Sequence, residues 1–166
     1  MNQVRVSNIT YIQTGQGWVY LTVIIDVFNR KVVGWAISYN LSTEANIITA
    51  WNMALKNNKI TKELIFHSDR VSQYPSYRFT NMIKKYSGLI KQSMRRKGNC
   101  WDYAVAESFF KSLKVEWVYK PKYNLKRELE LSVFTWIETW YNKRRRHSCL
   151  GYETINEFDL EMYNQM

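Results

Sequence analysis

The stretch WVYLTVIIDVFNRKVVGWAISY, from Trp18 to Tyr39, decides the fold. β-Branched and aromatic residues dominate both of its halves, which a short break at residues 29–30 separates. Such residues favour strands, and a short break between two strands is typical of a hairpin. The preceding segment VRVSNITYI (4–12) alternates loosely between apolar and polar residues and leads to the turn signal TGQG (14–17). We therefore predict an antiparallel meander of three strands.

After the meander, the period of the apolar residues changes. Four later segments have the apolar spacing that favours helices, at 42–58, from about 76, at about 104–119 and at about 126–142. Two short apolar runs, 62–69 and 88–94, are typical of buried strands. The predicted order is β-β-β-α-β-α-β-α-α, and the last two helices complete the chain. The fold class is therefore α/β, with a mixed five-stranded sheet flanked by helices on both faces.

The composition indicates one globular domain in a reducing compartment. The chain has 166 residues, of which 46% are hydrophobic, enough for a single core. No apolar run approaches the roughly 18 residues of a membrane span. The N-terminal segment MNQVRVSNIT (1–10) has no basic region followed by an apolar run, so we see no secretory signal. Two cysteines are too few for a disulfide framework, and neither lies in a zinc-binding pair.

The formal net charge of +10 indicates a polyanionic partner. Two basic runs, SMRRKGN (93–99) and NKRRRH (142–147), have aromatic residues close by at Trp101 and Trp140. The second run follows an amphipathic helix, so it can also be a solvated helix end that the helix dipole favours. Basic faces that bind nothing in particular are common as well. Because of the net charge, we favour contact with DNA phosphates, with six candidate residues: Arg95, Arg96, Lys97, Arg144, Arg145 and Arg146.

One carboxylate, Glu107, lies in the middle of the predicted helix 104–119, with Lys111 and Lys114 on its own face. An ordinary Glu–Lys pair at this spacing would stabilise the helix by only about 0.2–0.5 kcal/mol. Glu116 points about 180° away from Glu107, and we expect it to be solvated. The apolar residues of the helix form a separate stripe, made of Ala106, Phe110, Leu113 and Trp117.

A second acid, Asp69, ends the predicted strand 62–69, at an edge where α/β sheets bind ligands. Two acids in a basic groove suggest a divalent cation near phosphates, because Mg²⁺ prefers carboxylate and phosphate oxygens. Two such ions about 4 Å apart can activate the attacking oxygen and stabilise the leaving one. A bridging pair needs a third carboxylate, and the position expected for it on the first strand holds Asn8. His67 either assists this site or is a partly buried strand histidine.

Asp26 is the acid that could replace the missing carboxylate. With the hairpin turn at 14–17, Asn8 faces Val23 and Asp26 faces Arg5. Residues 5 and 8 point to opposite sides of the sheet because their separation is odd. We therefore predict that Asp26 pairs with Arg5, away from the metal site.

Three longer motifs resemble the catalytic core of bacterial insertion-sequence transposases of the DDE, integrase-core type: HSDRVSQY (67–74), SMRRKGNCWDYAVAESFFKSLK (93–114) and YNKRRRHSCLGY (141–152). That family is similar to retroviral integrases and shares their ribonuclease-H-like fold. The resemblance implies a single integrase-type catalytic core domain over residues 1–166, without the N-terminal helical domains that bind DNA ends. It also implies DNA partners (element ends and target), a homo-oligomer on DNA, no membrane, and a cytoplasmic place in the bacterial cytosol, at the nucleoid.

The resemblance assigns the three metal-binding positions of the family to Asn8, Asp69 and Glu107. The family's DIT segment reads NIT here, so Asn8 replaces the first catalytic aspartate. The implied cofactor is Mg²⁺ or Mn²⁺, with two ions in an intact family member. Lys111 and Lys114 match basic positions that approach terminal DNA in related integrases. The chain also departs from the family at four other positions: Arg5, Val71, Arg95 and Tyr103.

The implied activity is that of a DDE-type polynucleotidyl transferase, a transposase that cleaves and joins DNA phosphodiesters with the help of divalent metal. Asn8 has one neutral carbonyl oxygen and an NH₂ group that cannot bind a metal, so we expect impaired activity. The alternative is a catalytically dead DNA-binding or assembly module from a decayed transposase copy. A third possibility, binding by charge alone, predicts a steep salt dependence that survives Glu107→Gln.

Overall fold

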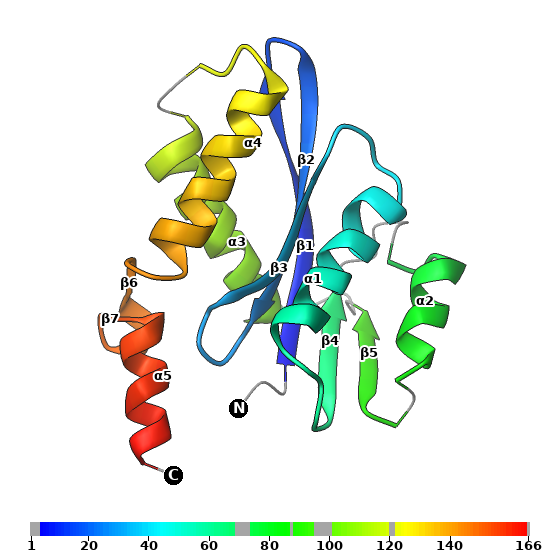
Figure 1. The fold of residues 1–166 in the computed structure, drawn as a ribbon, viewed down its shortest axis with the longest axis vertical. Helices are drawn as coiled ribbons and strands as arrows, with labels where there is room; N and C mark the ends of the chain where they lie inside the picture. Colours follow the sequence, from blue (N-terminus) through cyan, green and yellow to red (C-terminus); the bar gives the residue numbers. More distant parts are fainter. Residues whose placement is uncertain (1–3, 69–73, 87, 95–100, 120–121, 166) are drawn as a thin grey trace.

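A five-stranded sheet forms the centre of the molecule (Figure 1). The computed structural model describes residues 4–68, 74–86, 88–94, 101–119 and 122–165. The strands are β1 (Val4–Thr14), β2 (Gly17–Asp26), β3 (Val32–Ser38), β4 (Leu64–Ser68) and β5 (Ile90–Met94). Their order is β3-β2-β1-β4-β5, with antiparallel pairing among the first three strands and parallel pairing of β4 with β1 and β5. The predicted mixed sheet is confirmed.

The hairpin of β1 and β2 has the predicted register. Asn8 is opposite Val23, and Arg5 is opposite Asp26. The parallel ladder between β1 and β4 runs from Val4 to Ser7 on β1. Beyond Ser7, the outer edge of β1 has no strand partner among the residues described. On the other side of the hairpin, β3 pairs with β2 as far as Tyr20, which lies opposite Tyr11, so only the tip beyond these two residues extends past the other strands.

Helices cover both faces of the sheet (Figure 1). On one face lie α3 (Trp101–Leu113) and α4 (Lys126–Thr135), and α1 (Thr49–Asn57) and α2 (Tyr77–Lys84) belong to the core on the other face. Three of these helices contain π-helical turns: η1 (Glu44–Ile48) leads into α1, η2 (Lys114–Val118) continues α3, and η3 (Trp136–Tyr141) continues α4. The helix α3 begins at Trp101, before its predicted start near residue 104.

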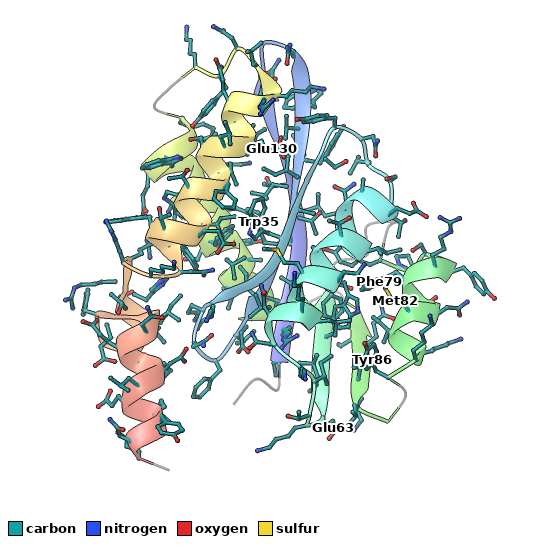
Figure 2. The ribbon with its side chains drawn as sticks, in the orientation of Figure 1. Trp35, Glu63, Phe79, Met82, Tyr86 and Glu130 are labelled. Carbon is teal, nitrogen blue, oxygen red and sulfur yellow. The ribbon has the colours of Figure 1, made fainter. Side chains whose placement is uncertain are left out.

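The core has two parts, one on each face of the sheet. Because side chains alternate along a strand, Val6 packs with the α3 and α4 side and Ile9 with the α1 and α2 side. On the α3 side, Phe109 stacks edge to face on Trp136 with ring centroids 5.5 Å apart. Trp35 points from β3 toward α4 and η3, where its Nε1 donates to Glu138 Oε1 at 2.7 Å (Figure 2). The first of these contacts joins α3 to η3, and the second joins β3 to η3.

The prediction that two helices complete the chain is wrong. After η3 the chain forms a small hairpin of β6 (Arg146–His147) and β7 (Glu153–Thr154) around the 3₁₀ turn η4 (Ser148–Leu150), and then the helix α5 (Ile155–Asn164). Thr154 caps α5, since its Oγ1 accepts from Glu157 N and its own N donates to Glu157 Oε2 at 2.8 Å. This Thr-x-x-Glu capping box is a readable sequence signal for the missed helix.

The described helices include none that is long and apolar enough to cross a membrane.

Candidate active site

Asn8 lies in the middle of β1 and faces the same side of the sheet as Val6, the side covered by α3. Its side chain is half-buried. Its Oδ1 accepts a hydrogen bond from the backbone N of Ile9 at 2.7 Å. A carbonyl oxygen has two lone pairs, so one acceptor direction of the amide is already used locally.

The carboxyl end of β4 lies beside Asn8. Ser68, the last residue of β4, is paired with Ser7, the residue before Asn8. His67 is opposite Val6 and therefore also faces the α3 side. Its ring is buried, and Nδ1 lies 3.1 Å from Ser93 Oγ of β5. His67 thus fits the interpretation of a buried strand histidine.

Several of the predicted site residues lie outside the described residues. They are Asp69, which follows β4, and the basic residues Arg95, Arg96 and Lys97. Within the described part of the chain, no group of three or more His, Cys, Asp or Glu side chains could hold a metal ion.

Glu107 is carried by α3, which packs on β1 and β2. Val105 and Ala106 beside it are buried against the sheet, whereas Glu107 is exposed. The predicted apolar stripe of α3 is confirmed, since Ala106, Phe110 and Leu113 are buried and Trp117 packs against them. Within the described part of the chain, the Glu107 carboxylate makes no hydrogen bond or ion pair. Its oxygens are therefore not committed to another described residue, and the helix that carries it lies on the side of the sheet that Asn8 faces.

The two lysines that follow Glu107 have different surroundings. Lys111 is exposed. Lys114 lies where α3 changes into the π-helical turn η2, and its Nζ is 5.9 Å from the ring centroid of Tyr11 on β1. Partial burial lowers the pKa of Lys114. Lys114 thus reaches toward the β1–β2 hairpin.

Asp26 lies on the face of the sheet opposite to Asn8. It lies opposite Arg5, and both side chains are almost fully buried on the other face of the sheet from Asn8. Burial raises the pKa of Asp26, although the hydrogen bond from Phe28 N and the Arg5 charge oppose that rise. The predicted register, with Asp26 opposite Arg5, is confirmed.

Glu116, predicted to be solvated, remains 38% exposed, but its carboxylate is paired with Arg145. Its two carboxylate oxygens accept from Arg145, at 2.8 Å from NH2 and 3.2 Å from Nε. Arg145 NH2 also donates to Ser112 Oγ at 3.0 Å. Glu116 lies in the π-helical turn η2, and its ion pair with Arg145 joins that turn to the basic run after η3. Of the neighbouring basic residues, Arg144 is exposed, and Arg146 donates to the carbonyl oxygen of Tyr152 at 2.9 Å.

A cavity of about 360 Å³ between α3 and the segment after η3 was not foreseen from the sequence. Arg145 and His147 line it on one side, and Ser108 and Ser112 of α3 on the other. Burial and the nearby Arg145 charge lower the pKa of His147 to about 4. Residues more than thirty positions apart build this cavity, so no local pattern announces it.

Comparisons with known proteins agree with this architecture. The sequence profile of the family described as "Integrase core domain" matches residues 1–100, and a second profile with the same description matches residues 89–154. Transposase InsF for insertion sequence IS3A of Escherichia coli (strain K12) is 37% identical over 158 residues, which are 95% of this chain and 54% of that protein. The transposase for insertion sequence element IS904 of Lactococcus lactis is 37% identical over 163 residues, 98% of this chain and 62% of that protein. The chain thus spans little more than half the length of these relatives.

Solved structures share the fold at low sequence identity. The HTLV-2 integrase catalytic core domain in complex with magnesium has a TM-score of 0.65 at 17% identity, over 95% of both chains. The catalytic core domain of BIV integrase has a TM-score of 0.66 at 16% identity, over 99% of this chain and 98% of that one. The mixed sheet, its helical layers and the profile matches agree: this chain has a ribonuclease-H-like fold and belongs to the integrase core domain family.

Proposed function

We propose that residues 1–166 form the catalytic core of a bacterial DNA transposase, acting on element ends and target DNA as a homo-oligomer in the cytosol, at the nucleoid. The observation that carries this proposal is that Asn8, next to the carboxyl end of β4, faces the side of the sheet that is covered by α3, the helix that carries Glu107. The family and the transposase relatives support it.

We propose Asp69 and Glu107 as the ligands of Mg²⁺ or Mn²⁺, with Asn8 at the third position. The donor set fits a hard cation, because the described members offer a carboxylate that is free of other partners and an amide oxygen. Two such ions would supply an activated attacking oxygen and a stabilised leaving oxygen. Asn8 reduces the carboxylates from three to two and uses one acceptor direction on Ile9 N, which weakens the site.

Contacts to DNA phosphates are proposed for the exposed cations around this face. Lys111 and Lys114 follow Glu107 along the same helix, and Arg144 is exposed beyond η3. Arg145 is a weaker candidate because its guanidinium is committed to Glu116. The remaining candidates, also part of this proposal, are Arg95, Arg96, Lys97 and Arg146.

A second candidate function is a catalytically dead DNA-binding or assembly module. The observation that favours it is the neutral Asn8 amide, whose oxygen already accepts from Ile9 N at 2.7 Å. In this case the fold and the basic surface would be retained while the metal site is lost.

Reversion of Asn8 separates the two functions. Nicking of supercoiled plasmid DNA with Mg²⁺ or Mn²⁺ is measured for the natural chain, for Asn8→Asp, and for Asn8→Asp combined with Glu107→Gln. An aspartate can accept the same hydrogen bond from Ile9 N, so the reverted chain should fold unchanged. We expect Asn8→Asp to raise the rate by about 100-fold or more, and Glu107→Gln to abolish that gain.

Two controls accompany this test. Glu63→Gln, at an exposed site before β4, should leave the activity of Asn8→Asp unchanged. Calorimetry with Mn²⁺ should show affinity about tenfold higher or more for Asn8→Asp than for the natural chain. Equal nicking by the natural and the reverted chain would refute the assignment of Asn8, and nicking that survives Glu107→Gln would refute the assignment of Glu107.

A further inference from the structure

A cavity of about 690 Å³ lies between the tip of the β1–β2 hairpin, the end of α3 and the segment before α4. We call it the hairpin groove, and define it by Tyr11, Trp18, Lys114, Tyr119, Lys122 and Tyr123. Figure 1 shows the hairpin tip beside the start of α4, beyond the end of the sheet. The groove is thus separate from the Asn8 and Glu107 positions.

The groove is preformed by contacts between the hairpin tip and the segment before α4. Gly15 N donates to the carbonyl oxygen of Tyr123 at 3.0 Å, and Lys126 N donates to Gln16 Oε1 at 3.0 Å. A Cβ at Gly15 would lie 2.8 Å from the carbonyl oxygen of Asn124, so only glycine permits this approach. A ligand therefore meets a site that needs little ordering on binding.

Aromatic rings line the groove and remain open to solvent. Tyr11 and Trp18 lie on neighbouring strands with ring centroids 5.2 Å apart and planes at 88°. Tyr11 is 61% exposed, Trp18 is 46% exposed and Tyr119 is 70% exposed. Exposed ring faces grouped in one concave site are typical of platforms on which nucleic-acid bases stack.

The charge of the groove suits a polyanion. Lys114 and Lys122 line it, and the described lining residues include no acid. Partial burial lowers the pKa of Lys114, whose Nζ lies 5.9 Å from the Tyr11 ring centroid. An anion bound next to Lys114 would replace part of the solvation that its ammonium group has lost through burial.

The spacing from the proposed active site suits a strand of DNA. Tyr11 lies three residues beyond Asn8 along β1, about 10 Å at the usual strand rise. Lys114 lies seven residues beyond Glu107 along α3 and η2, also about 10 Å at the helical rise. Both elements therefore run from the proposed active site toward the groove, over a distance of about three base steps. Tyr11 leaves β1 on the face opposite to Asn8, and the Lys114 side chain approaches its ring from the helix α3, so a nucleotide would reach Tyr11 at the edge of β1.

We propose that the hairpin groove binds an unpaired nucleotide of the DNA substrate, with its base against Tyr11 and Trp18 and its phosphates against Lys114 and Lys122. No described strand pairs with the outer edge of β1 beyond Ser7, and we propose that the DNA strand runs along this edge from the active site to the groove. This inference rests on the proposed DNA substrate, but not on metal binding or cleavage.

Binding without divalent metal tests the groove. Fluorescence anisotropy measures the affinity of the full chain for labelled oligothymidine of about 12 nucleotides and for an abasic strand of equal phosphate number. Because stacking needs bases, Tyr11→Leu should weaken oligothymidine binding about tenfold and leave abasic binding unchanged. Tyr11→Phe, which keeps the ring, should bind as the natural chain does. Tyr77→Leu, at an 80% exposed tyrosine of α2, is the matched control without effect.

A second variant and a second signal protect the test against a failure of folding. Tyr119→Leu should also weaken the binding of oligothymidine and leave the binding of the abasic strand unchanged. When 2-aminopurine replaces one base of the oligonucleotide, its fluorescence should fall on binding to the natural chain, because the base stacks, but not on binding to Tyr11→Leu. Equal losses for the two strands, or no loss in either leucine variant, would overturn the inference. Base-selective binding without cleavage by Asn8→Asp would refute only the proposed function, whereas cleavage without base selectivity would refute only the groove.

Discussion

At the scale of single residues, neighbouring arginines in the basic run at 142–147 differ in their surroundings: one is exposed to solvent and the next forms an ion pair within the fold. Arg144 is exposed, whereas the next residue, Arg145, binds both oxygens of Glu116 and the hydroxyl of Ser112. The Glu116 hydrogen bond raises the pKa of Arg145, so this cation stays charged within the fold. A phosphate would have to compete with Glu116 for Arg145, and it meets no such competitor at the exposed Arg144.

His147 predicts a specific pH dependence of stability. Its pKa is about 4 in the folded chain because burial and the Arg145 charge disfavour the protonated ring, and about 6.5 in the unfolded chain. The unfolded state therefore binds more protons between these values, and stability falls as the pH drops from about 6.5 toward 4. We expect the free energy of unfolding in urea to decrease by about 2 kcal/mol from pH 7 to pH 5 through this residue alone.

The comparison with His147→Gln isolates that share of the pH dependence. Glutamine does not titrate, so the free energy of unfolding of this variant should depend less on pH between pH 7 and pH 5. The carboxylates contribute equally to the pH dependence of both proteins. Parallel curves for the two chains would show that His147 has the same proton affinity folded and unfolded.

At the scale of elements, Asn142 joins the end of η3 to the edge strand β3. Its Oδ1 accepts from Val32 N at 3.0 Å, and its Nδ2 donates to the carbonyl oxygen of Val32 at 3.0 Å. The amide side chain thus acts as a short strand partner for β3, across 110 positions of sequence. It satisfies backbone groups of an edge strand that would otherwise be buried without partners.

Asn142→Asp should destabilise the fold by about 2–3 kcal/mol, because a buried carboxylate would replace the donor and face the Val32 carbonyl oxygen. Urea unfolding at pH 7 measures this loss. Asn52→Asp, the same change at an exposed site of α1, should shift the free energy of unfolding by no more than about 0.5 kcal/mol. A loss of similar size at both positions would mean that the two hydrogen bonds of Asn142 contribute nothing specific.

At the scale of the whole molecule, we expect the net charge of +10 to set the strength of the proposed DNA binding, and the distribution of the charge to set its location. Ion pairs inside the fold use part of the positive charge, as at Arg145, while Lys111 and Arg144 remain exposed. Each exposed cation that neutralises a phosphate releases bound counterions, so affinity falls steeply as salt rises.

With about five phosphate contacts, the logarithm of duplex affinity should fall with the logarithm of salt with a slope of about −4 to −5. Arg144→Gln should make this slope shallower by about one, because one phosphate contact is lost. Lys56→Gln, an equal charge change at an exposed site of α1, should leave the slope unchanged. Identical slopes for the two variants would place the DNA on a different surface.

Local patterns in the sequence were enough for the sheet and for the main helices. Alternation in the segments 4–12 and 18–39 predicts the meander and places Asp26 opposite Arg5, as the structure confirms. The stripe of α3 follows from its 3.6-residue period, which leaves Glu107 on an exposed face. These features depend on the pattern of apolar and polar residues within short segments, so they can be predicted from the sequence alone.

Contacts between distant segments were decided only by tertiary structure. The Arg145–Glu116 pair, the Asn142 bridge to Val32 and the hairpin groove each join residues that no periodicity relates. Their partners are brought together by the packing of α3 and η3 against the sheet. The sequence determines which residues are available as donors, acceptors and aromatic surfaces, and packing decides which of them meet, because long-range contacts form only once the layers are assembled.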